Sequence, residues 1–196
     1  MARKQLTKER ILEATLKLIE EKGSSNAINF REIARQLGCA HTSLYNFYDS
    51  FQEIKLDAVR MLVVNMRSEL AQRTQLILSE TESIMVTYSI VVIDYALEHK
   101  GWYRFLWMDY MEHNISEVLR DQPRPEKLLL KSLIEEYKLQ LKPLSEADAI
   151  TILQVGHAYT HGELCKFLSN RSEALDESDF KNEVIKNIQW IRRNNG

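Results

Sequence analysis

The chain has 196 residues, and 44% of them are hydrophobic, so it can bury a core and is not an intrinsically disordered protein. Its 26 Lys and Arg nearly balance its 28 Asp and Glu, and the formal net charge of -2 excludes a uniformly basic coat protein for nucleic acids. The charge is uneven, because residues 1–60 hold ten Lys or Arg and eight Asp or Glu. This net of +2 leaves -4 for the remainder and permits nucleic-acid binding near the amino terminus.

Hydrophobic periodicity predicts three short helices near the amino terminus. The first runs from Thr7 to Lys22 and ends at Gly23. The second begins after Asn29, which forms a capping-box pattern with Glu32, and Gly38 closes it. A short turn follows, and the next apolar stripe consists of Leu44, Phe47 and Tyr48. Three short helices with a glycine-containing turn between the last two are typical of a helix-turn-helix.

Longer helices are predicted beyond residue 50, over about residues 51–73, 82–99, 126–141, 145–168 and 178–193. The helix over 82–99 is apolar nearly all round, which indicates a central buried helix. Gly101 is predicted to break it, Pro123 and Pro125 predict a loop over 121–126, and Ser145 resembles a helix cap. The predicted fold class is all-α, with an amino-terminal three-helix helix-turn-helix domain and a carboxyl-terminal helical bundle.

Three segments of the first 60 residues carry the helical pattern described above, and they are Arg10–Ile19, Ile28–Gly38 and Ser43–Tyr48. Their order and separation resemble the TetR family of transcription regulators. The resemblance implies a DNA-binding domain over residues 1–50 and a helical effector-binding and dimerisation domain over residues 51–196. It also implies a homodimer on a palindromic double-stranded DNA operator. We expect a repressor released by a small molecule, with activation as the open alternative.

The third predicted helix, beginning near His41, can lie in the major groove with its first turns against base edges. Asn46 can bind adenine through two hydrogen bonds. The resemblance implies that Arg31 reaches a guanine and that Ser43 and Tyr45 contact phosphates. The complete set predicted to contact DNA is Arg3, Lys4, Arg31, His41, Thr42, Ser43, Tyr45 and Asn46.

Two positions depart from the family pattern. Ala40 stands where the family usually has a small polar cap, and Phe51 stands where it usually has a lysine that contacts phosphate. Losing that lysine removes one phosphate contact and weakens non-specific affinity, and the nearby Asp49 adds repulsion. These residues leave a rival interpretation open, in which a helix-turn-helix protein has lost DNA binding and acts through protein–protein contact.

Aromatic and methionine residues are concentrated in residues 102–111. They fit either core packing or a ligand cavity, and a sensor domain needs some of them at a cavity. We expect a small apolar or aromatic effector to bind among the helices spanning residues 61–168. The residues predicted to bind it are Met66, Tyr88, Val92, Phe105 and Met108.

His157 and His161 lie four residues apart, on one face of a predicted helix. Ala158 stands where a zinc peptidase has its general-base glutamate, and no third ligand is evident, so we predict no metal site. Small residues nearby, together with the last helix, favour a four-helix dimer interface instead. The predicted interface residues are Leu153, His157, His161, Leu164, Val184, Ile188 and Ile191.

The remaining sequence features concern compartment and chemistry. Cys39 and Cys165 lie far apart in the sequence and show no metal-ligand spacing. This pattern is typical of free thiols in a reducing compartment. The amino terminus lacks the apolar core of a signal peptide, and apolar runs such as Ile90–Ile93 are too short to cross a membrane. We therefore expect a cytoplasmic protein without membrane association or cofactor. The chain has no glycine-rich phosphate loop, nucleophile elbow or obvious carboxylate pair, so we do not expect an enzyme.

Overall fold

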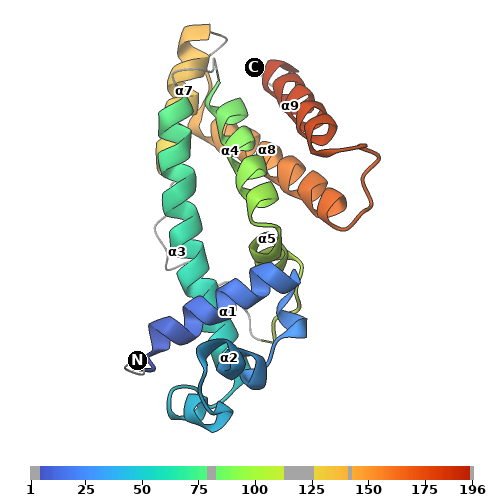
Figure 1. Cartoon of the computed structure of the whole chain (residues 1–196). Coiled ribbons are helices and arrows are strands. Elements are labelled where there is room, and N and C mark those ends of the chain that lie inside the picture. The colour runs from blue at the N-terminus through green and yellow to red at the C-terminus, as the bar shows by residue number, and fades with distance from the viewer. Residues whose placement is uncertain (1–4, 79–82, 113–125, 141–142, 195–196) are drawn as a thin grey trace. The chain divides into compact units, whose positions relative to one another are not determined.

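The computed structural model of the chain describes residues 5–78, 83–112, 126–140 and 143–194. Every element within these ranges is a helix, so the prediction of an all-α protein is confirmed (Figure 1). The helices form two compact units. The first comprises Met1–Met66 with His99–Gln122, and the second comprises Arg67–Glu98 with Pro123–Gly196.

The first unit contains α1 (Lys8–Lys22), the 3-10 helix η1 (Ser25–Ala27), α2 (Phe30–Leu37), the 3-10 helix η2 (His41–Asn46), the beginning of α3 (Phe51–Ile77) and α5 (Lys100–Trp107). The predicted helix ends are confirmed by their capping geometry. Gly23 and Gly38 adopt the left-handed conformation, with φ of 72° and 65°. The Asn29 side chain accepts hydrogen bonds from the backbone amides of Arg31 and Glu32.

The third short element differs from an ordinary α-helix. η2 is a 3-10 helix, and its capping residue Ala40 makes no side-chain hydrogen bond to it. Without a polar side chain at this position, the first amides of the element lack the partner that Ser, Asp or Asn supplies. Short segments commonly adopt the tighter 3-10 geometry.

The prediction that Gly101 breaks a helix is wrong, because the break lies at His99 and Gly101 lies inside α5. A Cβ atom at Gly101 would lie 2.6 Å from the Cα of Glu20 and 2.6 Å from the carbonyl oxygen of Ile19. Glycine is therefore required here by the close approach of α5 to α1. Trp102 reinforces this contact, since its indole Nε1 donates to the Leu16 carbonyl oxygen at 2.8 Å.

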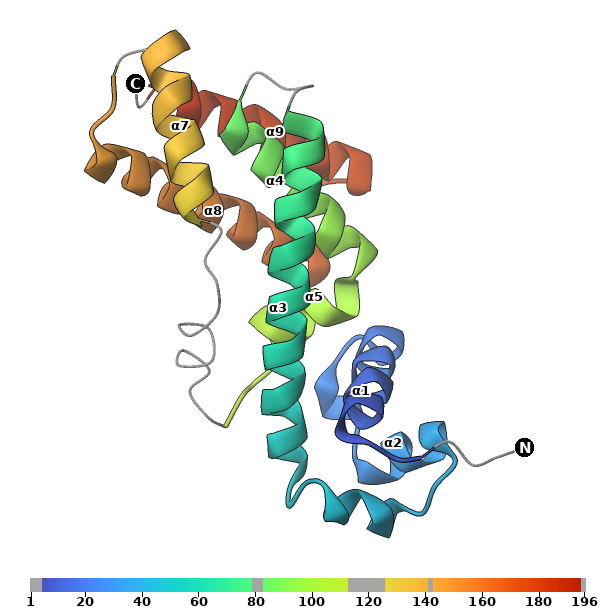
Figure 2. The same cartoon turned by 90° about the vertical axis from the view of Figure 1, so that its left-hand side faces the viewer.

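The second unit is built around α4 (Ile84–Glu98), and it also contains the end of α3, α7 (Glu126–Gln140), α8 (Glu146–Leu168) and α9 (Glu177–Asn194). α4 packs against α7, α8 and α9, as Figures 1 and 2 show, and most of its side chains are buried. The prediction of a central buried helix is thus confirmed. Ser145 caps α8 by accepting from the Asp148 amide, as predicted. The loop predicted over residues 121–126 lies largely outside the described residues.

One carboxylate joins three helices of this second unit. The Glu136 side chain on α7 accepts from the Ile84 amide at the start of α4, at 2.8 Å. It also accepts from the Arg192 Nε on α9, at 2.6 Å. The Glu136 and Arg192 side chains are only 8% and 13% exposed. Because it has hydrogen bonds to both neighbours, the buried Glu136 charge is compensated.

Candidate functional site

The side chains predicted to contact DNA lie on the outer side of α2 and η2. His41, Thr42, Tyr45 and Asn46 are exposed, and Ser43 is half-buried. Beneath them Leu44 and Tyr48 are buried, and they hold η2 against the core of the first unit. Arg31, on α2, is exposed as well, whereas Arg3 and Lys4 lie outside the described residues. A short polar surface over an apolar base is the arrangement that a recognition element needs.

Tyr45 has a structural role besides the predicted phosphate contact. Its ring lies against Phe30 on α2, with 4.6 Å between ring centroids and 36° between ring planes. The side chain nevertheless stays 52% exposed. The contact fixes η2 on α2 and restricts the ring, so a hydroxyl contact to DNA would need little further ordering.

The charges around Arg31 are partly compensated within the chain. Glu32 accepts from Lys22 at 2.6 Å and from Arg35 at 2.7 Å. The hydrogen bond from Lys22 lowers the pKa of Glu32, so its carboxylate stays ionised. Among the described residues Arg31 itself forms no ion pair. Arg31 is therefore the cation of α2 that is best placed to reach a phosphate or a base.

The junction between η2 and α3 is acidic. Ser50 accepts from the Glu53 amide at 3.3 Å, while the Glu53 carboxylate accepts from the Asp49 amide at 3.0 Å. This reciprocal pair resembles a capping box and begins α3. Phe51, the residue that replaces the lysine of the family pattern, is half-buried. The junction presents two exposed carboxylates, Asp49 and Glu53, beside a nearby cation, Lys8, which lies over the Tyr48 ring at 4.8 Å. The two carboxylates disfavour phosphate contact at this point.

Asp109, just beyond α5, ties this segment to the turn after α1. Its carboxylate accepts from the Ser25 amide and hydroxyl, both at 2.7 Å, and from the Ser24 hydroxyl at 3.1 Å. The buried Lys55 of α3 donates to the Tyr110 carbonyl oxygen at 3.2 Å. A displacement of α5 would therefore pull directly on the helices that carry the candidate DNA surface. No periodic pattern in the sequence marks these polar links, so they were not predicted.

No family model matches the chain, and no curated protein matches it either. Solved structures do. A TetR transcriptional regulator from Rhodococcus sp. RHA1 is 14% identical over 93% of both chains, with a TM-score of 0.57. The regulator SCO7222, a TetR from Streptomyces coelicolor, is 14% identical over 97% of this chain and 98% of its own, with a TM-score of 0.55. BioQ of Mycobacterium smegmatis is 16% identical over the same shares, with a TM-score of 0.53. The chain has the TetR fold.

The TetR fold confirms the predicted architecture of an amino-terminal helix-turn-helix followed by a larger helical domain. In this fold the surface of α2 and η2 described above is the helix-turn-helix. Within the described part of the chain, no helix combines the length and the apolar character that crossing a membrane requires.

A cavity of about 220 Å³ lies within the second unit of this TetR fold. Its described lining comes from α3, from Leu78 just after it, and from α4 and α7: Ala71, Thr74, Gln75, Leu78, Ile84, Tyr88, Leu129 and Ser132. None of these described residues is Asp, Glu, Lys or Arg. Of the five predicted ligand-binding residues, the structure brings Tyr88 to this cavity. Val92 is buried elsewhere on α4, while Met66, Phe105 and Met108 belong to the first unit. The polar lining residues Thr74, Gln75 and Ser132 were missed.

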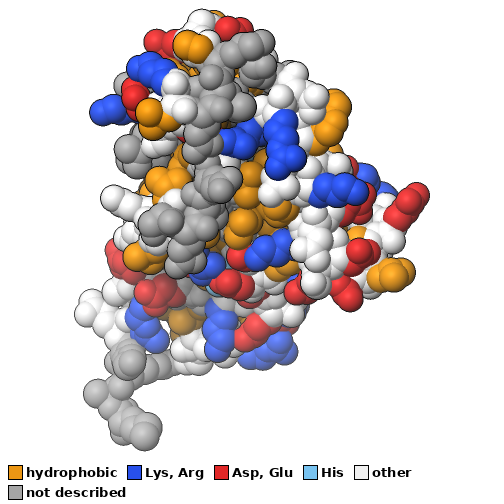
Figure 3. Space-filling model, turned by 90° about the horizontal axis from the view of Figure 1, so that it is seen from above, with side chains coloured by type: hydrophobic (Ala, Val, Ile, Leu, Met, Phe, Trp, Pro, Cys, Tyr) orange, Lys and Arg blue, Asp and Glu red, His pale blue; other side chains and the backbone are white. Residues whose placement is uncertain are grey.

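The predicted interface residues divide into two groups. Leu164, Val184 and Ile188 are at most 1% exposed and pack among the chain's own α4, α8 and α9. His157 is exposed, and Leu153, His161 and Ile191 are half-buried. The surface of α8 and α9 also exposes Ile150, which belongs to the predicted stripe of α8, and Val155 and Trp190, which were not predicted. Hydrophobic side chains also gather near the middle of the face seen in Figure 3, where Lys and Arg border them.

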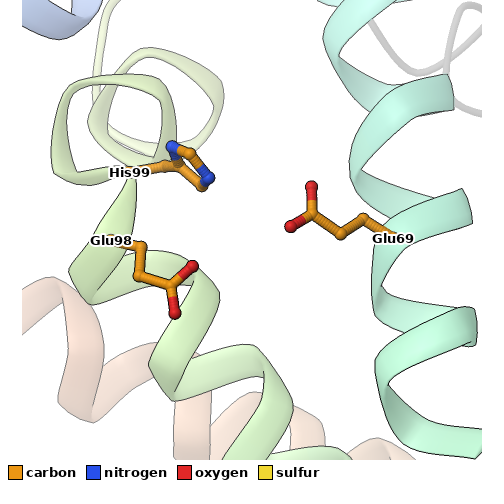
Figure 4. A group of neighbouring side chains, drawn as sticks. All are labelled: Glu69, Glu98 and His99. Atoms are coloured by element: carbon orange, nitrogen blue, oxygen red, sulfur yellow. The ribbon is translucent and has the colours of Figure 1, made fainter. Parts of the chain in front are cut away.

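A pair of acidic side chains also lies together in the second unit. Figure 4 shows Glu69 of α3 and Glu98 of α4, the residue before His99. Both carboxylates bind the guanidinium of Arg73, with Arg73 to Glu98 at 2.6 Å. The hydrogen bonds from Arg73 to these carboxylates raise the pKa of the guanidinium further above its usual range. The two negative charges are thus compensated by Arg73, and the pair functions as an ion-pair network.

Proposed function

We propose that the protein is a transcription regulator that binds a palindromic DNA operator as a homodimer in the cytoplasm. The observation that carries the proposal is the exposed polar edge of η2 over a buried apolar base, within a TetR fold. Asn46 reads a base and Tyr45 contacts phosphate, while Arg31 supplies the cation. The rival function, protein–protein contact without DNA, is favoured by the acidic η2–α3 junction.

Dimerisation through α8 and α9 is supported by the composition of α8. The segment from Ala149 to Gly162 contains no Asp, Glu, Lys or Arg, and its outer side exposes the apolar residues Ile150 and Val155. A helix that stays in water usually carries charges on its outer face. A second copy of the chain would cover this surface and place two recognition elements on one operator.

Release of the operator by a small molecule is supported by the cavity of the second unit. A cavity of about 150 Å³ is enough for benzene, so about 220 Å³ suits a molecule somewhat larger than benzene. The described lining residues are uncharged, which favours a neutral effector with a polar group for Thr74, Gln75 or Ser132. We propose that this ligand weakens operator binding and that the protein acts as a repressor.

The DNA-binding proposal predicts separate effects for two neighbouring residues. Asn46→Ala should cost roughly 1–3 kcal/mol at particular base pairs and relax specificity there, because a base contact is lost. Tyr45→Phe should weaken binding to all sequences about equally, because a phosphate contact carries no base information. Phe51→Lys should tighten binding generally and steepen its salt dependence. Gel shifts over a series of salt concentrations, on fragments selected from genomic DNA, measure all three.

Lys17 of α1 provides a control, because its side chain is exposed on the side of the helix away from the buried core. Lys17→Ala should leave the affinity for DNA almost unchanged. The base-reading role is wrong if Asn46→Ala weakens every sequence alike. If no fragment is selected, the protein–protein function replaces the present one.

The effector proposal predicts that filling the cavity blocks ligand binding. A neutral ligand at about a hundred times its dissociation constant should stabilise the protein by roughly 2.7 kcal/mol, which raises the melting temperature. Ala71→Leu fills the cavity and should abolish this gain, whereas Leu76→Ala, on the exposed side of α3, should keep it. Thermal-shift screening of a metabolite library measures the effect. Equal stabilisation of both variants would place the effector elsewhere.

A further inference from the structure

The outer side of α8 carries a histidine and a cysteine one helical turn apart. His161 and Cys165 are separated by four residues, and the His161 Nε2 lies 3.7 Å from the Cys165 Sγ. A tetrahedral zinc ion binds nitrogen at about 2.0–2.1 Å and sulfur at about 2.3 Å, which places the two ligand atoms about 3.6 Å apart. The two side chains are therefore already spaced as two ligands of one ion.

One chain supplies only half of such a site. Among the described residues, no third His, Cys, Asp or Glu offers a ligand atom close to both. His157 stacks near His161, with ring centroids 6.1 Å apart, but it lies two full turns from Cys165. Zinc sites usually have four ligands, or three and a water molecule. A complete site therefore requires ligands from outside the chain.

Gly162 indicates where those ligands come from. A Cβ atom at this residue would meet nothing within 4 Å, so the packing of the chain itself does not require glycine there. A glycine inside a helix costs about 1 kcal/mol relative to alanine. The close approach of another helix would account for a glycine at this position despite the cost. Ala158, one turn earlier, extends the surface formed by small side chains. The partner helix would thus come nearest beside His161 and Cys165.

We propose that the α8 helices of two copies cross beside Gly162, and that His161 and Cys165 of both copies bind one thiophilic divalent cation of the zinc class. The inference rests on the dimer of the proposed function. Two-fold symmetry gives each copy the same contacts, so two imidazoles and two thiolates surround the ion. Each thiol releases its proton to solvent when the ion binds, and the imidazoles bind in their neutral form.

Burial shifts the pKa values of the two side chains in directions that act oppositely on metal binding. Burial lowers the pKa of His161, which favours the neutral imidazole, and the neighbouring His157 adds to this effect. Burial raises the pKa of Cys165, so the thiol is protonated until the ion displaces its proton. His161 lies near the end of the stretch Ala149–Gly162 that lacks Asp, Glu, Lys and Arg, and Cys165 lies between Glu163 and Lys166, which form an ion pair.

Cobalt titration of the full-length protein tests the site, because Co²⁺ bound to thiolates absorbs in the near ultraviolet and visible range. We expect this absorption to saturate at one Co²⁺ per dimer and to disappear when Zn²⁺ is added. Cys165→Ser and His161→Gln should each weaken binding more than about 100-fold, since changes to residues that only support metal ligands already cost 10–100-fold. Cys39→Ser is the matched control and should bind as the original protein does, because Cys39 lies in the first unit.

Gly162→Leu should prevent both dimerisation and Co²⁺ absorption while the helix content, measured by circular dichroism, stays the same. Retained Co²⁺ absorption in Cys165→Ser, loss of it in Cys39→Ser, or one ion per chain would each overturn the shared site. A dimer that binds its operator without any thiolate absorption would overturn the metal site and leave the proposed function intact. A monomer that binds neither DNA nor Co²⁺ would overturn both.

Discussion

Glu136→Ala is expected to destabilise the protein by about 3–5 kcal/mol, the range for removing one partner of a buried ion pair. Glu136 is 8% exposed and binds both the Arg192 guanidinium and the Ile84 amide. Its removal takes a compensating charge away from Arg192 and leaves the first amide of α4 without this acceptor. Both losses act on the packing of α4, α7 and α9. Urea unfolding followed by circular dichroism measures the change in free energy of unfolding.

The neighbouring Glu135 provides the matched control. It pairs with Lys138 on the same helix, but both side chains are more than half exposed. Such surface pairs contribute little, so Glu135→Ala should change the free energy of unfolding by less than about 0.5 kcal/mol. Equal effects of the two substitutions would show that the Glu136 contacts do not hold the second unit together.

Gly101→Ala is expected to destabilise the first unit by roughly 1–3 kcal/mol, although alanine is the better helix former. The new methyl group would lie 2.6 Å from backbone atoms of Glu20 and Ile19, and backbone yields less readily than a side chain. α5 must then move away from α1, which lengthens the hydrogen bond from Trp102 to Leu16. In the proposed function, operator affinity should fall together with the melting temperature, since α1 packs against α2 and α2 packs against η2.

Trp102→Phe separates the two contributions to this contact, because it removes the indole hydrogen bond but leaves the close approach at Gly101. It should cost about 1 kcal/mol, as the loss of one part-buried hydrogen bond does. A Gly101→Ala protein that melts at or above the original temperature would show that α1 and α5 have room between them.

Local signals explain which parts of the fold could be predicted. Asn29, Gly38 and Ser145 act on backbone groups within a few residues, so their roles are readable from neighbouring sequence. From sequence alone, Gly101 cannot be distinguished from a glycine that ends a helix. Its role, to allow the close approach of α5 to α1, becomes visible only when the position of α1 is known. The same limit applies to Asp109, whose partners lie more than 80 residues earlier.

The candidate sites show the same division. The exposed edge of η2 follows from one apolar stripe, and the structure places Asn46 and Tyr45 on the surface as that stripe implies. The apolar stripes of α8 and α9 do not reveal whether a residue faces its own chain or a second copy. Leu164 was therefore selected for an interface although the chain itself buries it. The cavity lining joins three helices, and no periodicity within one helix predicts where such helices meet.

The contacts of α5 with α1, and of Asp109 with Ser25, have a consequence for how this protein is made and engineered. The first 66 residues are only part of their compact unit, since residues 99–112 complete it. During synthesis, α1 must wait for this later segment to emerge from the ribosome before its exposed side is covered. A hybrid protein that joined residues 1–50 to a foreign helical domain would lose the partners of Leu16, Glu20 and Ser25. Exchange of recognition specificity should therefore transfer the α5 segment together with the amino-terminal helices.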